Sequence, residues 1–155
     1  MIRVLFVCLG NICRSPMAEA VMRKLVQEAG LESKITVDSV GTGGWHEGNP
    51  PHEGTLNILN RYGISSEGIV ARQINVEDLT TSEYIIVMDE TNLNDVKALG
   101  ELGQGTHLGK LCDFIDNTNY EDVPDPYYTG DFDETYELTI AGARGLLAHI
   151  KSRGL

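Results

Sequence analysis

The sequence predicts an α/β fold: a single domain, residues 1–155, in which a four-stranded parallel sheet of strand order 2-1-3-4 has helices on both faces. Two observations lead to this prediction. Short apolar runs with the composition of buried strands alternate with segments whose apolar residues recur at helical spacing. The 155 residues suffice for one domain with one core, and they contain no internal repeat, low-complexity tract or linker. A doubly wound sheet is the simplest arrangement of such elements.

The first strand, the first helix and the second strand are predicted to form a right-handed parallel crossover. Residues 2–7 are rich in Val, Ile and Phe and form the first strand, and residues 35–40 form the second. Between them, apolar residues recur at helical spacing up to Gly30, a typical helix stop. Ser15 is the candidate N-cap of this helix, and Pro16 suits its first turn.

The rest of the chain is predicted to supply two more strands and the remaining helices. The strands are residues 84–88 and 107–111, the helical segments are residues 52–62, 76–81 and 90–99, and residues 71–74 form a short extended piece. Asp89 is the candidate N-cap of the helix that follows it. Asp131, with Glu134 in capping-box position, begins the last helix. Residues 117–130 are polar and without periodicity, and loops of this length are uncommon unless they are functional.

The charge of the chain argues against several classes of partner. The formal net charge of −11 disfavours nucleic acid and anionic membrane surfaces, which attract basic proteins. No apolar stretch approaches the length of a membrane span, and the N-terminus lacks the pattern of a signal peptide, so we expect a soluble, cytoplasmic protein. Nine carboxylates and no Lys or Arg lie between Asp113 and Glu137. They form either a solvated acidic face or a surface that repels acidic peptides.

The cysteines indicate a reducing compartment, because their number, three, is odd and a chain of this size needs no disulfide. Cys8 and Cys13 lack the C-x2-C spacing of zinc sites, so we expect neither a metal nor another cofactor. Cys112 has no ligand or redox partner nearby in sequence and is interpreted as a buried structural thiol.

The segment with the clearest chemical meaning, Cys-Leu-Gly-Asn-Ile-Cys-Arg-Ser-Pro at residues 8–16, connects the first strand to the first helix. Backbone N–H groups of such a loop and the positive end of the helix dipole make an anion site. Arg14 adds a planar donor fork suited to phosphate. A cysteine in that field should exist largely as the thiolate. The segment therefore predicts phosphoryl transfer with Cys8 as nucleophile and a phosphocysteine intermediate. If Cys8 were only a small buried hydrophobe, Arg14 at a helix start would stay unexplained.

This loop, together with Val-Pro-Asp-Pro-Tyr-Tyr at residues 123–128, resembles the low-molecular-weight protein tyrosine phosphatase family. Length and element order agree over essentially the whole chain. The resemblance implies a metal-independent enzyme that hydrolyses phosphotyrosine in proteins and releases inorganic phosphate. We expect a monomer or weak self-association. The loop residues that would bind phosphate are Leu9, Gly10, Asn11, Ile12 and Cys13.

Four side chains are predicted to assist Cys8. Arg14 and the loop N–H groups would hold the equatorial oxygens as charge builds on them. Ser15 can donate its hydroxyl to the Cys8 sulfur, in competition with helix capping. Asp89, at the carboxyl end of the third strand, could orient the loop. Asp125 is either a turn residue between prolines or the general acid, and the resemblance favours the acid.

Three aromatic residues are candidates for the walls of the cleft. Trp45, the only Trp, lies in a loop rich in glycine and proline. It is either an anchor packed on the core or a wall of the cleft. The resemblance favours a wall against the substrate ring, with Tyr127 and Tyr128 on the opposite side. An aryl phosphate would reach a deep cysteine more easily than the shorter phosphoserine.

Two loop features stay open. Cys13 either packs beneath the loop or, as the resemblance implies, is a resolving thiol that forms a reversible disulfide with Cys8 and makes the enzyme redox-sensitive. Ile69 occupies the place where family members often carry a His that supports the loop through its Asn, and this departure puts that support in doubt.

Three other functions are weighed against the tyrosine phosphatase. Thioredoxin-coupled arsenate reductases share the loop but use two further cysteines, and residues 89–105 contain none. Protein-arginine phosphatases tend to carry Thr where this chain has Ile12, and they lack the Tyr pair. A non-catalytic phosphate-binding module would not need all the chemical groups that this sequence supplies.

Overall fold

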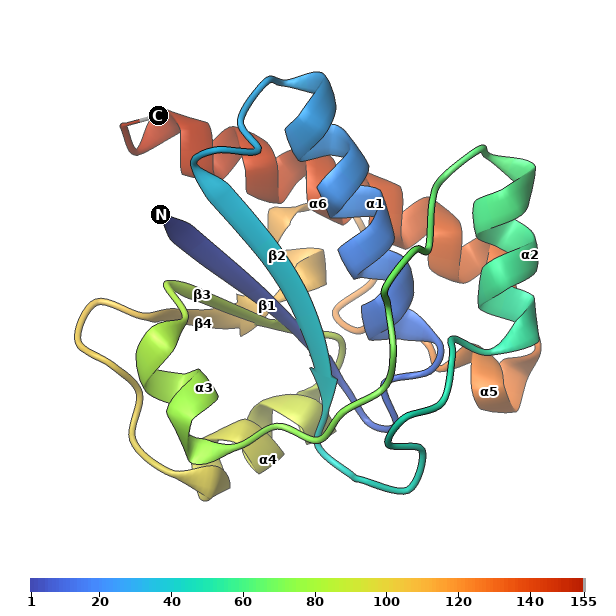
Figure 1. The fold of residues 1–155 in the computed structure, drawn as a ribbon, viewed down its shortest axis with the longest axis horizontal. Helices are drawn as coiled ribbons and strands as arrows, with labels where there is room; N and C mark the ends of the chain where they lie inside the picture. The colour runs from blue at the N-terminus through green and yellow to red at the C-terminus, as the bar shows by residue number, and fades with distance from the viewer. Residues whose placement is uncertain (155) are drawn as a thin grey trace.

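Four parallel strands form one sheet in the order β2-β1-β3-β4 in the computed structural model, which describes residues 1–154 (Figure 1). The strands are β1 (Ile2–Cys8), β2 (Ile35–Gly41), β3 (Tyr84–Val87) and β4 (His107–Lys110). The central strand β1 pairs with β2 on one side and β3 on the other, and its last residue, Cys8, lies opposite Gly41. The predicted fold class and strand order are confirmed.

Helices cover both faces of the sheet. They are α1 (Arg14–Glu28), α2 (Glu53–Arg61), α3 (Val76–Thr81), α4 (Glu90–Leu99), the 3₁₀ helix η1 (Leu111–Phe114), α5 (Pro126–Thr129) and α6 (Phe132–Ser152). Alternate residues of β1 point to opposite faces, as in any strand. Val4 and Phe6 join a core with α1, α2 and α6, and Leu5 and Val7 join a second core with α3 and α4. These four residues are fully buried, which explains why β1 is apolar throughout its central part, from Val4 to Val7.

Two details of the prediction are wrong. The helix α1 begins at Arg14, its N-cap is Cys13 without a side-chain cap bond, and Ser15 is a buried residue inside the first turn. Residues 117–130 are not uniformly a loop, because they contain the four-residue helix α5. Asp125 caps its start, and Gly130, at φ 76°, ends it. The short helix η1 was also not predicted. None of the helices in the described residues is both long and apolar enough to cross a membrane.

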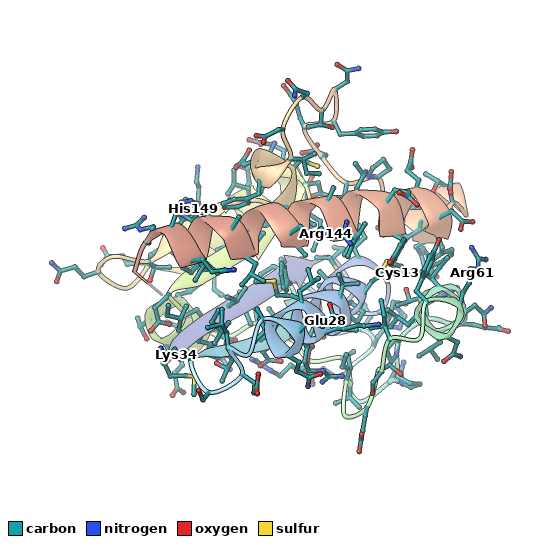
Figure 2. All side chains as sticks on the ribbon, turned by 90° about the horizontal axis from the view of Figure 1, so that it is seen from above. Cys13, Glu28, Lys34, Arg61, Arg144 and His149 are labelled. Carbon is teal, nitrogen blue, oxygen red and sulfur yellow. The ribbon has the colours of Figure 1, made fainter. Side chains whose placement is uncertain are left out.

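The long helix α6 lies along one side of the molecule (Figure 2). It packs closely against η1 at Gly142 and Gly145. A Cβ atom on Gly145 would lie only 1.9 Å from the carbonyl oxygen of Phe114. We therefore expect Gly145→Ala to destabilise the fold by about 1–3 kcal/mol, because overpacking forces α6 away from η1. Chemical denaturation measures this change. The sign of the change in the free energy of unfolding distinguishes two effects, because helix propensity alone would stabilise the alanine variant by about 1 kcal/mol. A more stable variant would contradict the packing described here.

Candidate active site

The loop of residues 9–13 lies between the end of β1 and the start of α1, with the Cys8 side chain buried beneath it. Two of its carbonyl groups accept hydrogen bonds from more distant parts of the chain. Leu9 O accepts the N–H of Gly43 at 2.9 Å, and Ile12 O accepts that of His52 at 2.7 Å. By contrast, within residues 1–154 no hydrogen bond is donated by the backbone N–H groups of this loop. The loop therefore offers a set of free donors next to a thiol, as an anion site requires.

Asn11 braces the loop from within. Its φ of 55° lies in the left-handed region, which Asn tolerates better than most residues. Its Oδ1 accepts the backbone N–H of Arg72 at 3.0 Å. Its Nδ2 donates to the hydroxyls of Ser15 at 2.7 Å and Ser39 at 3.0 Å. Ile69 is buried in the core, so the bracing of the loop comes from these two serines and the Arg72 backbone.

Ser15 connects this bracing to the cysteine. Its Oγ lies 3.0 Å from Cys8 Sγ and 3.3 Å from the carbonyl oxygen of Val40. Because Asn11 already donates to this oxygen, the hydroxyl hydrogen remains free to go to the sulfur or to the carbonyl group. A thiolate is the stronger acceptor, so the arrangement suits stabilisation of a charged sulfur.

Arg14, the first residue of α1, is buried, with 2% of its surface exposed. Its Nη1 donates to Asp89 Oδ2 at 2.7 Å and to the Val123 carbonyl at 2.9 Å. Burial opposes the charge, but the negative groups Cys8, Asp89 and Asp125 outweigh it and raise the pKa of Arg14. Its Nε has no hydrogen-bond partner among the described residues. A buried donor without a partner is costly, and an oxyanion in the loop would satisfy it.

The two carboxylate oxygens of Asp89 bind different partners, and the predicted cap of α4 is confirmed. Its Oδ1 accepts the N–H of Asn92 and caps α4, while Oδ2 holds Arg14. The side chain that fixes the start of α4 therefore also fixes the guanidinium group.

Asp125 reaches the loop from more than a hundred residues away in sequence. Its Oδ1 accepts the N–H of Tyr127 at 3.1 Å as the cap of α5, and its Oδ2 accepts Arg14 Nη2 at 3.3 Å. Pro126 occupies the first turn of α5, where its fixed φ suits a helix start. The cap and Pro126 together fix Asp125, which lines the same pocket as Cys8.

A pocket of about 210 Å³ opens above the sulfur. It is lined by Cys8, Leu9, Gly10, Ile12, Cys13, Trp45, His46, Asp125, Tyr127 and Tyr128. Trp45 is 71% exposed, so it is not an anchor packed on the core. Its ring instead lies on the backbone at Gly43, where a Cβ atom would come within 1.8 Å of the ring. Tyr127 and Tyr128 are also exposed and stand edge to face, with ring centroids 5.3 Å apart.

Cys13 lies beside α2 (Figure 2), and its carbonyl group accepts the hydroxyl of Thr55. Burial, followed by the nearby charges of Cys8 and Asp125, raises the pKa of the Cys13 thiol to about 12. Burial likewise raises the pKa of Cys112 to about 11. Both are therefore protonated thiols at neutral pH, and all three cysteines are free.

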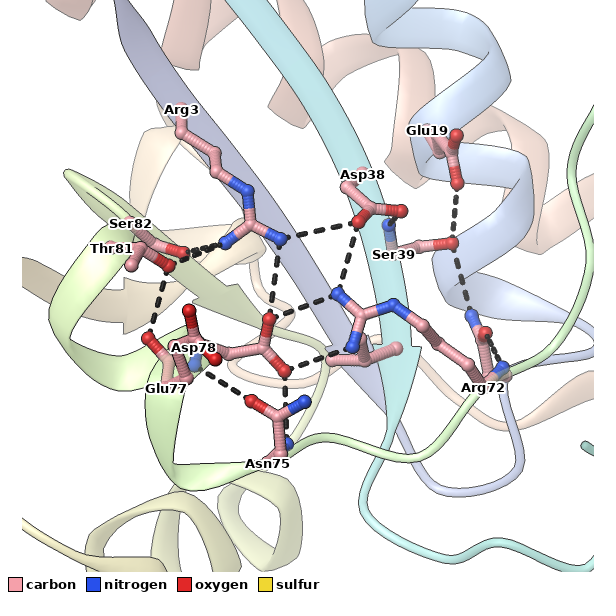
Figure 3. Close-up of polar contacts among 12 residues, drawn as sticks. Arg3, Glu19, Asp38, Ser39, Arg72, Asn75, Glu77, Asp78, Thr81 and Ser82 are labelled. Carbon is pink, nitrogen blue, oxygen red and sulfur yellow. Dashed lines mark hydrogen bonds and ion pairs between the residues drawn. The ribbon is translucent and has the colours of Figure 1, made fainter.

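Arg72 belongs to an ion cluster with Arg3, Asp38 and Asp78 (Figure 3). The Arg72 guanidinium group contacts Asp38 at 3.0 Å and Asp78 at 2.9 Å, and Arg3 contacts the same two carboxylates at 3.2 Å. Burial favours a higher pKa for the Asp78 carboxyl group. The hydrogen bonds from Arg72 and the Asn75 backbone outweigh this effect and keep the pKa of Asp78 below its usual range. Because the N–H of Arg72 holds Asn11, this cluster anchors the loop to β1, β2 and α3.

Sequence reasoning missed His46, Ser39, Glu19 and the Val123 carbonyl group. His46 follows Trp45 directly, and its ring lies against Gly10. That adjacency is a signal that could have revealed it. The other three contact the site across long sequence separations, for which a single sequence gives no local pattern. Among the described residues, no group of three or more His, Cys, Asp and Glu side chains could hold a metal ion.

The chain is similar to known proteins over its whole length. A family model described as low molecular weight phosphotyrosine protein phosphatase matches residues 3–154. The low molecular weight protein-tyrosine-phosphatase YfkJ of Bacillus subtilis is 52% identical, with 97% of each chain covered. PtpA of Staphylococcus epidermidis, named as the same kind of phosphatase, is 47% identical over 97% of this chain and 94% of its own.

Solved structures show the same similarity. The crystal structure of YfkJ superposes with a TM-score of 0.96 at 51% identity and covers 100% of this chain and 98% of its own. That of a Drosophila arginine phosphatase has a TM-score of 0.88 at 30% identity, with 97% of this chain and 98% of its own covered.

Proposed function

Because the chain belongs to the low molecular weight phosphotyrosine protein phosphatase family, it is a protein tyrosine phosphatase, and we propose that Cys8 is its nucleophile. The Cys8 sulfur attacks the phosphorus of phosphotyrosine, the phosphorus–oxygen bond to the ring breaks, and a phosphocysteine forms. Water then attacks this intermediate and releases inorganic phosphate and the thiolate. The contact of 3.0 Å between Ser15 Oγ and Cys8 Sγ supports the role, since it stabilises the thiolate before attack and as leaving group.

Arg14 and the loop N–H groups stabilise the charge that develops on the phosphoryl oxygens. The unpaired Nε of Arg14 and the free N–H groups of residues 9–13 are preorganised for three equatorial oxygens. Asp89 acts as a positioning residue, because its Oδ2 accepts a hydrogen bond from Arg14 Nη1 and so holds the guanidinium group in place.

Asp125 is the general acid. In the first step it protonates the oxygen of the leaving tyrosine, and in the second it takes a proton from the attacking water. Two observations support this role: Asp125 lines the pocket, and its Oδ2 is held by Arg14.

The substrate is a phosphotyrosine side chain in a protein. The observation that carries this choice is the lining of the pocket: Cys8, which is 3% exposed, shares it with the exposed rings of Trp45, Tyr127 and Tyr128. A flat ring fits between these aromatic side chains, whereas phosphoserine is too short to reach the sulfur from the same position.

The test is a panel of phosphotyrosine, phosphoserine and phosphoarginine peptides, with arsenate and thioredoxin as a separate reaction. We expect the highest kcat/KM for phosphotyrosine, without added metal. Trp45→Ala should raise KM for the phosphotyrosine peptide about tenfold and change kcat little, because it removes one aromatic contact. The matched control is Tyr120→Ala, which removes an exposed ring that does not line the pocket. An unchanged KM in Trp45→Ala would contradict the proposed wall.

Phosphoarginine hydrolysis is the second candidate, because one similar structure is an arginine phosphatase. Ile12 and the Tyr pair favour the tyrosine substrate. A higher kcat/KM for the phosphoarginine peptide would reverse this preference.

The proposal extends to the compartment, the oligomeric state and the partners of the enzyme. Three free cysteines suit a reducing compartment such as the cytoplasm. The protein acts as a monomer or a weakly associating one, on phosphoproteins rather than on nucleic acid or membranes. The role of Cys13 as a resolving thiol stays a prediction.

A further inference from the structure

A buried carboxyl group ends a chain of hydrogen bonds that begins at the nucleophile. Glu19 lies in the second turn of α1, is 8% exposed, and its Oε1 accepts the hydroxyl of Ser39 at 2.6 Å. Ser39 Oγ accepts Asn11 Nδ2 at 3.0 Å. The same Nδ2 donates to Ser15 Oγ, which contacts Cys8 Sγ. Figure 3 shows Glu19 pointing at Ser39 from the helix side of the sheet. Glu19 is thus connected to the reacting sulfur through three side chains.

The direction of each bond in this chain follows from its two ends. The backbone N–H of Arg72 can only donate, so Asn11 must present its oxygen there and its NH₂ group to the two serines. Ser39 must then accept from Asn11 and send its own hydrogen to Glu19. An ionised carboxylate can only accept, so it enforces this direction.

A protonated Glu19 would not enforce it. The carboxylic acid carries its own O–H and can donate to Ser39, which then turns its hydrogen toward Asn11 and opposes the Asn11 N–H. The left-handed conformation of Asn11 is less favourable than ordinary backbone and persists only while its surroundings hold it. Loss of the Ser39 contact therefore weakens the loop conformation that presents the free N–H groups.

The charged groups around Glu19 do not offset the effect of its burial. Arg23, on the same helix, approaches Oε2 only to 4.0 Å, Arg72 acts from the segment before α3, and Asp38 on β2 opposes the negative charge. Burial is the largest influence, and it raises the pKa of Glu19 to about 7. The carboxylate is the main form above this pH and the acid is the main form below it.

We propose that Glu19 is a positioning residue whose ionised carboxylate holds the phosphate-binding loop in its anion-binding conformation through Ser39 and Asn11. The loop then loses oxyanion affinity as Glu19 takes up a proton. This proposal rests on the proposed role of residues 9–14 as the phosphate cradle.

Sulfate is a suitable probe, because it stays doubly charged over the pH range of interest whereas phosphate and phosphate esters titrate within it. Its affinity for the full chain is measured by calorimetry from about pH 5.5 to about pH 8.5. We expect the affinity of the unmodified chain to fall about tenfold as the pH is lowered through 7. Glu19→Gln keeps the shape and an acceptor oxygen but cannot titrate, so this step should be absent from its profile. Glu28→Gln removes an exposed carboxylate from the same helix and should retain the step.

A double-mutant cycle tests whether Glu19 acts through Ser39. Ser39→Ala should lower kcat/KM and remove the pH step. Adding Glu19→Gln to Ser39→Ala should then cause no further loss. Additive losses would contradict the proposed connection. Thermal unfolding of each variant verifies that it is folded at every pH used.

Different results would contradict the assignment of the phosphate cradle and the role of Glu19. If the unmodified chain binds no sulfate at any pH, the assignment of the phosphate cradle is wrong, and the role of Glu19 falls with it. If sulfate binds and the same pH step persists in Glu19→Gln, the cradle stands and Glu19 is only a buried structural carboxyl group.

Discussion

Cys8→Ser is expected to abolish turnover of phosphotyrosine peptides while leaving oxyanion binding in place. A serine hydroxyl stays protonated at neutral pH and is a poor nucleophile without an adjacent base. The loop N–H groups and the guanidinium group of Arg14, which we propose hold the anion, are untouched by the substitution. We expect kcat/KM to fall by on the order of 10⁴-fold or more, with sulfate binding retained.

The control for this variant is Cys112→Ser, which replaces a buried thiol outside the pocket. It should keep turnover and change only stability. Measurable hydrolysis by Cys8→Ser above the background of the uncatalysed reaction would exclude the phosphocysteine mechanism.

Asp125→Asn is expected to have the second largest effect, and one that depends on the leaving group. Asparagine can still accept the N–H of Tyr127 with its Oδ1, so the cap of α5 survives, but it cannot protonate a leaving oxygen. We expect kcat/KM to fall about 10²–10⁴-fold for esters of poorly acidic phenols and much less for p-nitrophenyl phosphate. The measurement is a plot of log kcat/KM against the leaving-group pKa.

The comparison uses kcat/KM because it reports the steps up to formation of the phosphoenzyme, in which the acid acts. Glu121→Gln removes one charge from the same acidic segment at an exposed position and should keep the dependence of the unmodified chain. An equal loss for every ester in Asp125→Asn would argue for an electrostatic role beside Arg14 rather than proton transfer.

The fold could be predicted from the sequence because its signals are local. Apolar runs, helical spacing and capping residues lie within a few positions of one another, and the parallel order follows from their alternation. The helix bounds of α3 and α4 were predicted to the residue, since Asp89 caps α4. The short helix η1 was missed, because its four residues carry no periodicity.

The error at Ser15 has a specific physical cause. A serine before a proline at the start of a helical pattern satisfies the local rule for an N-cap. The structure instead uses its hydroxyl in the buried contact with Cys8, and the side chain of Cys13, the actual cap position, makes no cap bond. The sulfur of Cys8, seven residues back on the preceding strand, was recognised as a competing partner, but a local rule cannot decide which of the two partners the hydroxyl takes.

The parts of the site that the sequence did not reveal are all long-range. The resemblance pointed to a missing His at Ile69, but it did not indicate what would brace the loop instead. The bracing by Ser39 and the Arg72 backbone connects Asn11 with residues 28 and 61 positions away. Trp45 had two acceptable interpretations, and its exposure over Gly43 excludes the anchor packed on the core, while its role as a wall against the substrate stays a prediction.

The most direct test of the central claim is to look for the phosphoryl group on Cys8 itself. The enzyme is mixed with an excess of phosphotyrosine peptide and quenched within one turnover, and the proteolytic fragment that contains Cys8 and Cys13 is sequenced by mass spectrometry. The account predicts the mass of one phosphoryl group on Cys8, and none in the Cys8→Ser protein. A phosphoryl group on any other residue, or turnover without phosphorylation of Cys8, would contradict it.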